Sequence, residues 1–89
     1  MYELEAITKI SENQYEVDAF IKLSDLTDHI GILLESEDYD SLGGYVIELL
    51  DHLPTEGETV KKDGITFKVL SMDKNRVDRV AIIIDPELQ

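Results

Sequence analysis

Residues 40 to 58 hold the feature that constrains the fold most, a single amphipathic helix. Their apolar side chains recur at the spacing of one stripe along a 3.6-residue helix, at Leu42, Tyr45, Val46, Leu49, Leu50 and Leu53. The opposite side of the same helix carries Gly44, Glu48, Asp51 and His52. We therefore expect a helix with one dry face and one wet, acidic face.

Local signals predict where this helix begins and ends. Asp40 or Ser41 suits its amino-terminal cap, because a short polar side chain can accept a backbone hydrogen bond there. Pro54 cannot continue a helix and pushes the preceding residue out of the helical region. Gly57 then supplies a turn position that few other residues tolerate. The helix should therefore end near His52.

The residues before this helix indicate a β-hairpin and a shorter helix. Apolar residues are frequent from Leu4 to Ile10, residues 11 to 14 form a polar turn, and residues 15 to 19 alternate with a period of two. Ser24 is a good N-cap for the shorter helix, which Gly31 should end. The side chains expected on one side of that helix are Leu26, Ile30 and either Leu33 or Leu34.

The residues after the central helix predict three strands. Residues 59 to 62 form the first strand, Asp63-Gly64 is a tight two-residue turn, and Ile65, Phe67 and Val69 alternate along the second strand. Residues 73 to 75 make the next turn. The last strand, residues 76 to 85, is apolar on both faces, with Val80, Ile82 and Ile84 on one and Val77, Ala81 and Ile83 on the other. Such a strand is central or covered on both sides.

Together these elements predict an α+β fold. The order is a hairpin, two helices and a three-stranded meander, so the helices should pack on one face of an antiparallel sheet. The chain has 89 residues, which fits a single domain, residues 1–89, with a small core. Because the core is small, the domain could also form a homo-oligomer through a sheet edge or a helix face.

The charge balance restricts the class of partner. Twenty Asp and Glu residues against eight Lys and Arg residues give a net charge of −12. This field repels phosphate backbones and anionic headgroups, so we expect neither nucleic acid nor a membrane surface as the partner. No apolar run approaches the roughly 20 residues of a membrane span, and no cysteine is present for a disulfide framework. These features fit a cytoplasmic domain with a cationic partner.

The sequence offers few residues for catalysis. Its two histidines, His29 and His52, lie on different predicted helices, and its serines fall in loops or at caps. Gly43-Gly44 lacks the longer glycine spacing and the lysine of a phosphate-binding loop. We therefore expect no enzymatic activity and no resident cofactor.

A cluster of acids before the central helix raises the question of a metal site. Glu35, Glu37, Asp38 and Asp40 fall within six residues, and Mg²⁺ and Ca²⁺ prefer clustered carboxylates. The cluster is not an EF-hand, because Leu42 and Leu49 occupy positions that need oxygen ligands. Two interpretations remain: a water-rich Mg²⁺ or Ca²⁺ site, and a solvated loop whose acids favour the positive end of the helix dipole.

The central stretch also carries a family resemblance. The run Asp40-Ser41-Leu42-Gly43-Gly44, the apolar stripe, Leu53-Pro54, Gly57-Glu58 and Val60 resemble the transporter-associated domain of CorC/HlyC-type proteins. The resemblance continues through Gly64, Phe67-Lys68-Val69 and Asn75-Arg76-Val77. Ser41 and Ala19 depart from the threonine and the glycine that are more common in this family.

This resemblance implies a non-catalytic cytosolic module of hemolysin-like, CBS-domain-containing membrane proteins linked to magnesium and cobalt efflux. Its fold would be similar in shape to an FAD-binding subdomain, although FAD is not expected to bind. The chain would then be excised from the carboxyl terminus of a longer membrane protein. It would lie at the cytoplasmic face of the membrane, beside the CBS and membrane domains of that protein.

The resemblance further implies a regulatory or assembly role. We hypothesise that Glu48, Asp51 and the acids of residues 35 to 40 form the contact surface or sense a cation. The alternative is a free-standing acidic interaction module that binds a basic partner. Apolar spans encoded upstream of Met1 would favour the transporter, and an in-frame start at Met1 would favour the alternative.

Overall fold

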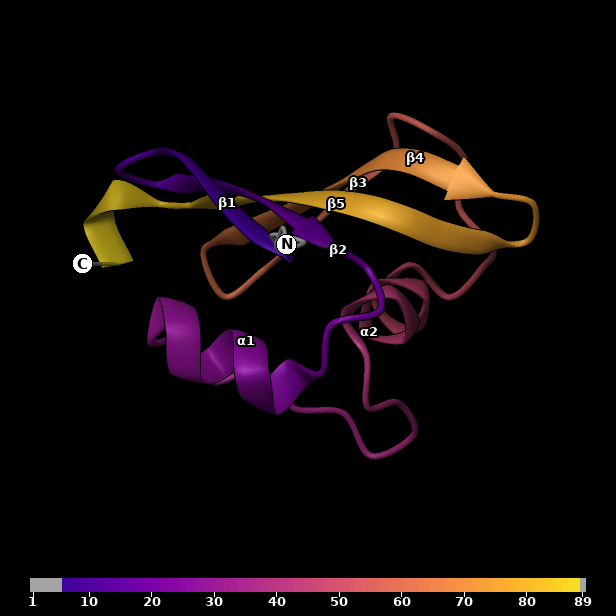
Figure 1. The fold of residues 1–89 in the computed structure, drawn as a ribbon, viewed down its shortest axis with the longest axis horizontal. Helices are drawn as coiled ribbons and strands as arrows, with labels where there is room; N and C mark the ends of the chain where they lie inside the picture. Colours follow the sequence, from indigo (N-terminus) through magenta and orange to yellow (C-terminus); the bar gives the residue numbers. More distant parts are fainter. Residues whose placement is uncertain (1–5, 89) are drawn as a thin grey trace, which may run out of the picture.

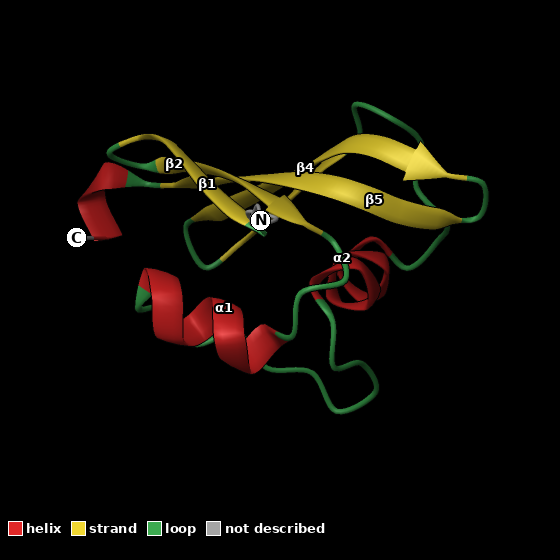
Figure 2. Cartoon of the chain, in the orientation of Figure 1, coloured by secondary structure: helices red, strands yellow, loops and turns green. Residues whose placement is uncertain are grey.

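The structure, a computed structural model, describes residues 6–88. Its strands are β1 (Ile7–Ser11), β2 (Gln14–Asp18), β3 (Thr59–Lys62), β4 (Ile65–Asp73) and β5 (Arg76–Ile84), and its helices are α1 (Leu23–Ile30), α2 (Leu42–Leu50) and the 3₁₀ helix η1 (Pro86–Leu88). The strands form one antiparallel sheet in the order β1-β2-β5-β4-β3, and α1 and α2 lie on the same face of it (Figures 1 and 2). The predicted α+β fold is confirmed.

The first hairpin has a tighter turn than its sequence predicts. The turn occupies only residues 12 and 13, because Ser11 pairs with Gln14 across the two strands. Ala19 follows β2 instead of belonging to it. The predicted start of the first strand at Leu4 lies outside the described residues. Along β2 the alternation holds, and Val17 is fully buried in the core.

β5 is the central strand, as its apolar sequence predicts. It pairs with β2 on one side and with β4 on the other, and its core-facing side chains are Val80, Ile82 and Ile84. Ala81 points away from the helices and is still only 2% exposed. Its cross-strand neighbours are Glu16 and Lys68, whose long side chains flank the alanine methyl group.

Val77 lies on the face opposite to the predicted one. Strict alternation from Val80 would turn Val77 away from the helices, yet both side chains belong to the same buried core. The β4–β5 register shifts between Val69 and Met72, so that Met72 pairs with Val77. These two successive irregularities interrupt the inward and outward alternation of side chains along β5, because an extra residue at a bulge reverses the face on which the following side chains lie.

α1 begins without the predicted serine cap. Its first residue is Leu23, and its N-cap residue, Lys22, makes no side-chain cap hydrogen bond. Ser24 therefore lies inside the helix. The Leu23 amide donates instead to the backbone carbonyl of Asp40, at 2.7 Å. A distant segment of backbone thus replaces the local cap.

The carboxyl end of α1 follows the sequence prediction. Gly31 ends the helix in the left-handed conformation, with φ of +79°, and its amide donates to the carbonyl of Thr27. Of the two leucines that follow, Leu34 is 5% exposed and Leu33 is 69% exposed. Leu34 therefore completes the apolar side of α1, and Leu33 remains at the surface.

The first three backbone amides of α2 all have hydrogen-bond acceptors. The Leu42 amide donates to the carbonyl of Ile21 at 3.0 Å, and the Gly43 amide donates to the carbonyl of Ala19 at 2.7 Å. Ser41 is the N-cap, and its hydroxyl accepts from the Gly44 amide at 3.3 Å. Two of these bonds reach the β2–α1 connection, so the start of α2 is tied to the end of the first hairpin.

α2 ends earlier than predicted. Its last residue is Leu50, and Asp51, not His52, follows as the C-cap in the left-handed conformation with φ of +64°. Leu53 is 51% exposed and does not continue the apolar stripe, because the backbone has already left the helix. Tyr45, by contrast, is buried and meets the Phe67 ring edge to face, with ring centroids 5.6 Å apart.

The two glycines of α2 are sites of close approach. A Cβ atom on Gly43 would lie 3.1 Å from the Ala19 Cβ and 3.2 Å from the Ala19 carbonyl oxygen. A Cβ atom on Gly44 would lie 2.6 Å from Cγ of Tyr39. Gly44 was predicted to lie on the wet face; instead the Tyr39 ring covers it. Only a residue without a side chain lets α2 pack this closely.

We expect the substitution Gly43→Ala to lower the free energy of unfolding by about 1 to 3 kcal/mol, because the added methyl group overpacks the contact with Ala19. Alanine has the higher helix propensity, so propensity alone predicts the opposite sign. Urea denaturation measures the change. Ser24→Ala, at an exposed position of α1, is the control and should change stability by less than about 0.5 kcal/mol. A Gly43→Ala domain as stable as the parent would contradict the close approach.

Candidate functional site

The charges of this chain are segregated between its two layers. Residues 23 to 60 contain ten Asp and Glu residues and no Lys or Arg. These residues form α1, α2, the connections around them and the first two residues of β3, and we call them the acidic layer. Six of the eight basic residues follow in the meander, at Lys61, Lys62, Lys68, Lys74, Arg76 and Arg79. The acidic layer therefore projects a negative potential from the helical side of the molecule.

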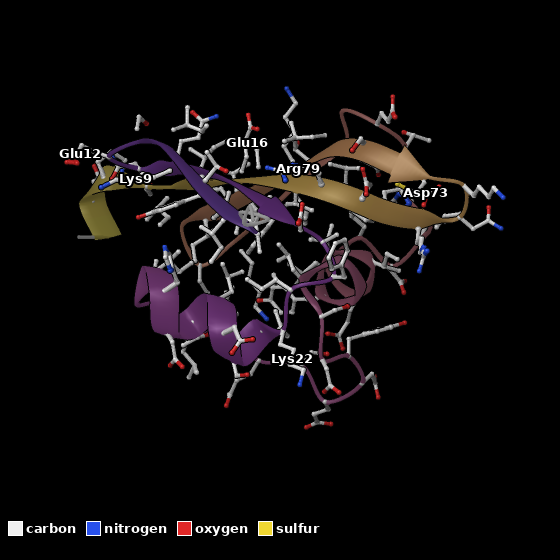
Figure 3. All side chains as sticks on the ribbon, in the orientation of Figure 1. Lys9, Glu12, Glu16, Lys22, Asp73 and Arg79 are labelled. Atoms are coloured by element: carbon white, nitrogen blue, oxygen red, sulfur yellow. The ribbon has the colours of Figure 1, made fainter. Side chains whose placement is uncertain are left out.

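Four acids of the sheet and its turns have local basic partners. Arg79 lies 2.5 Å from an Asp18 oxygen and 3.9 Å from a Glu16 oxygen, on the side of the sheet away from the helices (Figure 3). Two further exposed pairs are Lys9–Glu12 and Arg76–Asp73. Such pairs stabilise the fold little, but they cancel charge locally. Within residues 6–88, no Lys or Arg side chain forms an ion pair with an acid of the acidic layer.

The structure joins Glu48 to the acidic loop of residues 35–40. The Ser36 hydroxyl donates to Oε1 of Glu48 at 2.7 Å. The Ser36 hydroxyl oxygen also accepts from the backbone amides of Asp38 and Tyr39, at 3.2 and 3.1 Å. Ser36 therefore folds the loop and holds it against the exposed face of α2. Sequence reasoning placed Glu48 and the loop on one surface but did not identify Ser36 as the link.

The remaining residues of the predicted site occupy separate positions. Glu35, Glu37, Asp38 and Asp40 are all exposed along the loop. Asp51 is exposed at the carboxyl end of α2. Within residues 6–88, no three Asp, Glu or His side chains converge on a point where they could hold a metal ion. In the described part of the chain, the loop acids therefore form an exposed negative surface.

A second polar arrangement follows α2. The Glu58 carboxylate accepts a hydrogen bond from the Thr55 amide at 3.1 Å, and its other oxygen contacts the His52 ring. The Thr55 hydrogen bond, followed by the His52 contact, lowers the pKa of Glu58 below its ordinary value. On the other side of α2, burial raises the pKa of Tyr45, and the charges of Asp63 and Glu48 raise it further.

Comparison with known proteins identifies the family. The sequence profile described as "Transporter associated domain", CorC_HlyC, matches residues 8–86. The chain belongs to the CorC_HlyC transporter-associated domain family. The resemblance drawn from residues 40 to 77 is thereby confirmed. Its glycines have structural roles in this domain, since Gly43 and Gly44 permit the close packing of α2.

The relatives of this transporter-associated domain include efflux proteins and solved domains. The magnesium and cobalt efflux protein CorC of Salmonella typhimurium is 33% identical over 76 residues, which cover 85% of this chain and 26% of that protein. The chain therefore spans about a quarter of the length of this relative. A CorC-associated region from Neisseria meningitidis has the same fold, with a TM-score of 0.82 and 30% identity over 90% of this chain and 99% of that one.

One structural neighbour was solved with metal ions. The transporter-associated domain of a Xylella fastidiosa hemolysin, in complex with Mg²⁺ and Mn²⁺, has a TM-score of 0.77 and covers 90% of this chain and 98% of its own. At 18% identity, this likeness establishes the fold alone. Within the described part of the present domain, no helix is long and apolar enough to cross a membrane.

We expect an NMR titration to place the pKa of the Glu58 carboxyl group below 4.5. Because the folded-state pKa is lowered, the stabilising contribution of Glu58 is present above its unfolded-state pKa and is lost as the pH falls through the folded-state pKa. His52→Ala should raise the pKa of Glu58 only in part, because the Thr55 amide still donates. A Glu58 pKa at or above 4.5 in the parent domain would show that these hydrogen bonds do not persist in solution.

We expect the acidic loop to bind Mg²⁺ no more tightly than about 1 mM, because three carboxylates do not converge there. The measurement is an NMR titration with MgCl₂ that follows the amides of residues 35–40. The triple variant Glu35→Gln/Glu37→Gln/Asp38→Asn should abolish any saturable shift, and Asp73→Asn is the control. Micromolar binding would refute the open geometry, and no response at millimolar Mg²⁺ would remove the predicted metal site.

Proposed function

We propose that this domain is a non-catalytic regulatory or assembly module of a larger magnesium and cobalt efflux protein. The matched region covers only 26% of the CorC efflux protein to which it is similar, which favours a role as one part of such a protein. We further propose that residues 1–89 form a single domain at the cytoplasmic face of the membrane. Its neighbours there would be the CBS and membrane domains of the parent transporter.

The segregation of charge carries this proposal. Ten acids without Lys or Arg partners repel one another and lower the stability of the isolated domain. A basic surface on a neighbouring domain would relieve that repulsion, so docking is electrostatically favoured. Glu48 and the acids of the loop would meet such a surface together, because Ser36 holds them in one place. At physiological salt this attraction acts over about 8 Å, so it operates mainly at close range.

The positions of the nucleophile candidates favour a non-catalytic role. His29 is exposed in the last turn of α1, and His52 contacts Glu58 after α2. Within the described part of the chain, neither ring is hydrogen-bonded to a hydroxyl group. Ser36 folds the loop and Ser41 caps α2, so these hydroxyl groups already have structural partners. Acyl transfer needs a histidine base within hydrogen-bond distance of a serine nucleophile. The positions of these side chains therefore favour a non-catalytic role.

The proposal is tested in a full-length efflux protein that carries this domain. The variant Glu48→Gln/Asp51→Asn, combined with Gln or Asn at Glu35, Glu37, Asp38 and Asp40, should change cation efflux or transporter assembly by about fivefold or more, the usual size of coupling between domains. The readouts are the rate of Mg²⁺ efflux from loaded cells and the oligomeric state in detergent.

The control removes acids from the sheet instead. Glu12→Gln/Asp73→Asn changes exposed acids that already pair with Lys9 and Arg76, and it should leave efflux and assembly unchanged. The thermal stability of the isolated domain should not fall in either variant. Normal efflux and normal assembly in the variant of the acidic layer would refute the proposed contact surface.

A further inference from the structure

A groove lies between α1 and the segment that returns toward α2. It has a volume of about 820 Å³, and its lining residues are Lys22, Leu23, Ser24, Thr27, Asp28, Leu33–Glu37, Tyr39 and Asp40. Thr27 fixes one wall, because its hydroxyl accepts a hydrogen bond from the Leu34 amide at 3.1 Å. The other end is held by the bond from the Leu23 amide to the Asp40 carbonyl. Figure 3 labels Lys22 at the start of α1, where the groove ends.

The groove combines apolar walls with an acidic rim. Leu23 and Leu34 are nearly buried at its base. Leu33 is 69% exposed and Tyr39 is 40% exposed, although both are large apolar side chains. The charged lining residues are four acids, at Asp28, Glu35, Glu37 and Asp40, and one base, at Lys22. Exposed apolar side chains within a charged rim are typical of a protein interaction site.

The returning segment also has unused backbone groups. From Ile32 to Tyr39, no backbone group is hydrogen-bonded to the backbone of another described residue. Side-chain oxygens accept from only three amides of this segment, those of Leu34, Asp38 and Tyr39. The amides of Leu33 and Glu35 therefore remain available to a bound chain. An extended peptide uses such groups for main-chain hydrogen bonds when it binds beside an unpaired segment.

We propose that this groove binds an extended peptide segment in which leucine-sized apolar side chains alternate with Lys or Arg. This inference deepens the proposed function, on which it rests, by naming the chemistry of the partner. The apolar side chains contact Leu33 and Tyr39, the basic ones pair with the acidic rim, and the main chain bonds to residues 32–39. A second copy of this chain, with net charge −12, or a phosphate-bearing ligand would be repelled by the same rim.

The test uses a fluorescein-labelled peptide of alternating Leu and Lys and the complete chain of 89 residues. Fluorescence anisotropy gives the affinity, and amide NMR shifts locate the site. Two control peptides separate the contributions: alternating Leu and Glu removes the charge match, and alternating Gly and Lys removes the apolar contact. All peptides are kept below the concentration at which they associate with themselves. Only the Leu–Lys peptide should bind saturably, with the largest shifts at Thr27 and at residues 33–40.

Two pairs of variants separate this groove from general attraction to a negative protein. Leu33→Ser should weaken Leu–Lys peptide binding about tenfold, and its control is Ile10→Ser, at a side chain that is 49% exposed on the first hairpin. Glu35→Gln/Glu37→Gln should weaken binding by a similar factor, and its control is Glu12→Gln/Glu87→Gln, with the same change in net charge. Both controls should bind as the parent does. Thermal unfolding verifies that each variant is folded.

Equal loss of binding in groove variants and controls would overturn the inference, and so would unchanged binding to Leu33→Ser. In that event the proposed function can still hold, because its test changes the wider acidic layer and measures efflux and assembly. Conversely, tight and groove-specific peptide binding together with normal efflux and normal assembly would retain the groove and refute the proposed contact surface in the transporter. The two failures are therefore distinguishable.

Discussion

The close approach of α2 to the end of β2 is the contact on which the rest of the structure depends. The Gly43 amide donates to the Ala19 carbonyl, and a side chain at Gly43 would collide with the same residue. This contact seats the helix on the sheet, beside Val77. Two further bonds hold the segment that enters α2, since the Leu42 amide donates to the Ile21 carbonyl and the Leu23 amide donates to the Asp40 carbonyl. The geometry of the acidic loop follows from these anchors.

Charge is distributed according to the same two layers. The sheet carries acids with basic neighbours, such as Asp18 with Arg79, whereas residues 23 to 60 carry acids alone. A domain that functions alone in solution would gain stability from a few basic residues in the acidic layer, because like charges repel. Their absence is understandable if a basic partner covers this side of the domain. This is the physical basis of both the proposed function and the proposed groove.

The residues that identify the family are mainly those that shape the backbone. Gly43 and Gly44 allow close packing, Ser41 caps α2, and Asp63-Gly64 closes the β3–β4 hairpin. Each of them determines geometry and none performs chemistry, so the resemblance predicts the fold and the class of parent protein more directly than a mechanism. Glu48 and the loop acids were predicted from the sequence as parts of one candidate surface. Its connection through Ser36 was not predicted, because Ser36 lies in a loop without periodicity, twelve residues before Glu48 in α2.

The sequence by itself determined the elements whose signals are local. The alternation of β5 from Val80 to Ile84, the turn at Asp63-Gly64 and the end of α1 at Gly31 depend only on neighbouring residues, and all three appear as predicted. Tertiary structure decided the start of α1, where the Asp40 carbonyl replaces a serine cap, and the inward side chain of Val77, which a register shift reverses. It also decided that Glu35, Glu37 and Asp40 line a groove beside α1. Those outcomes depend on hydrogen bonds and packing between distant segments, and periodicity and turn chemistry along the chain contain no information about such contacts.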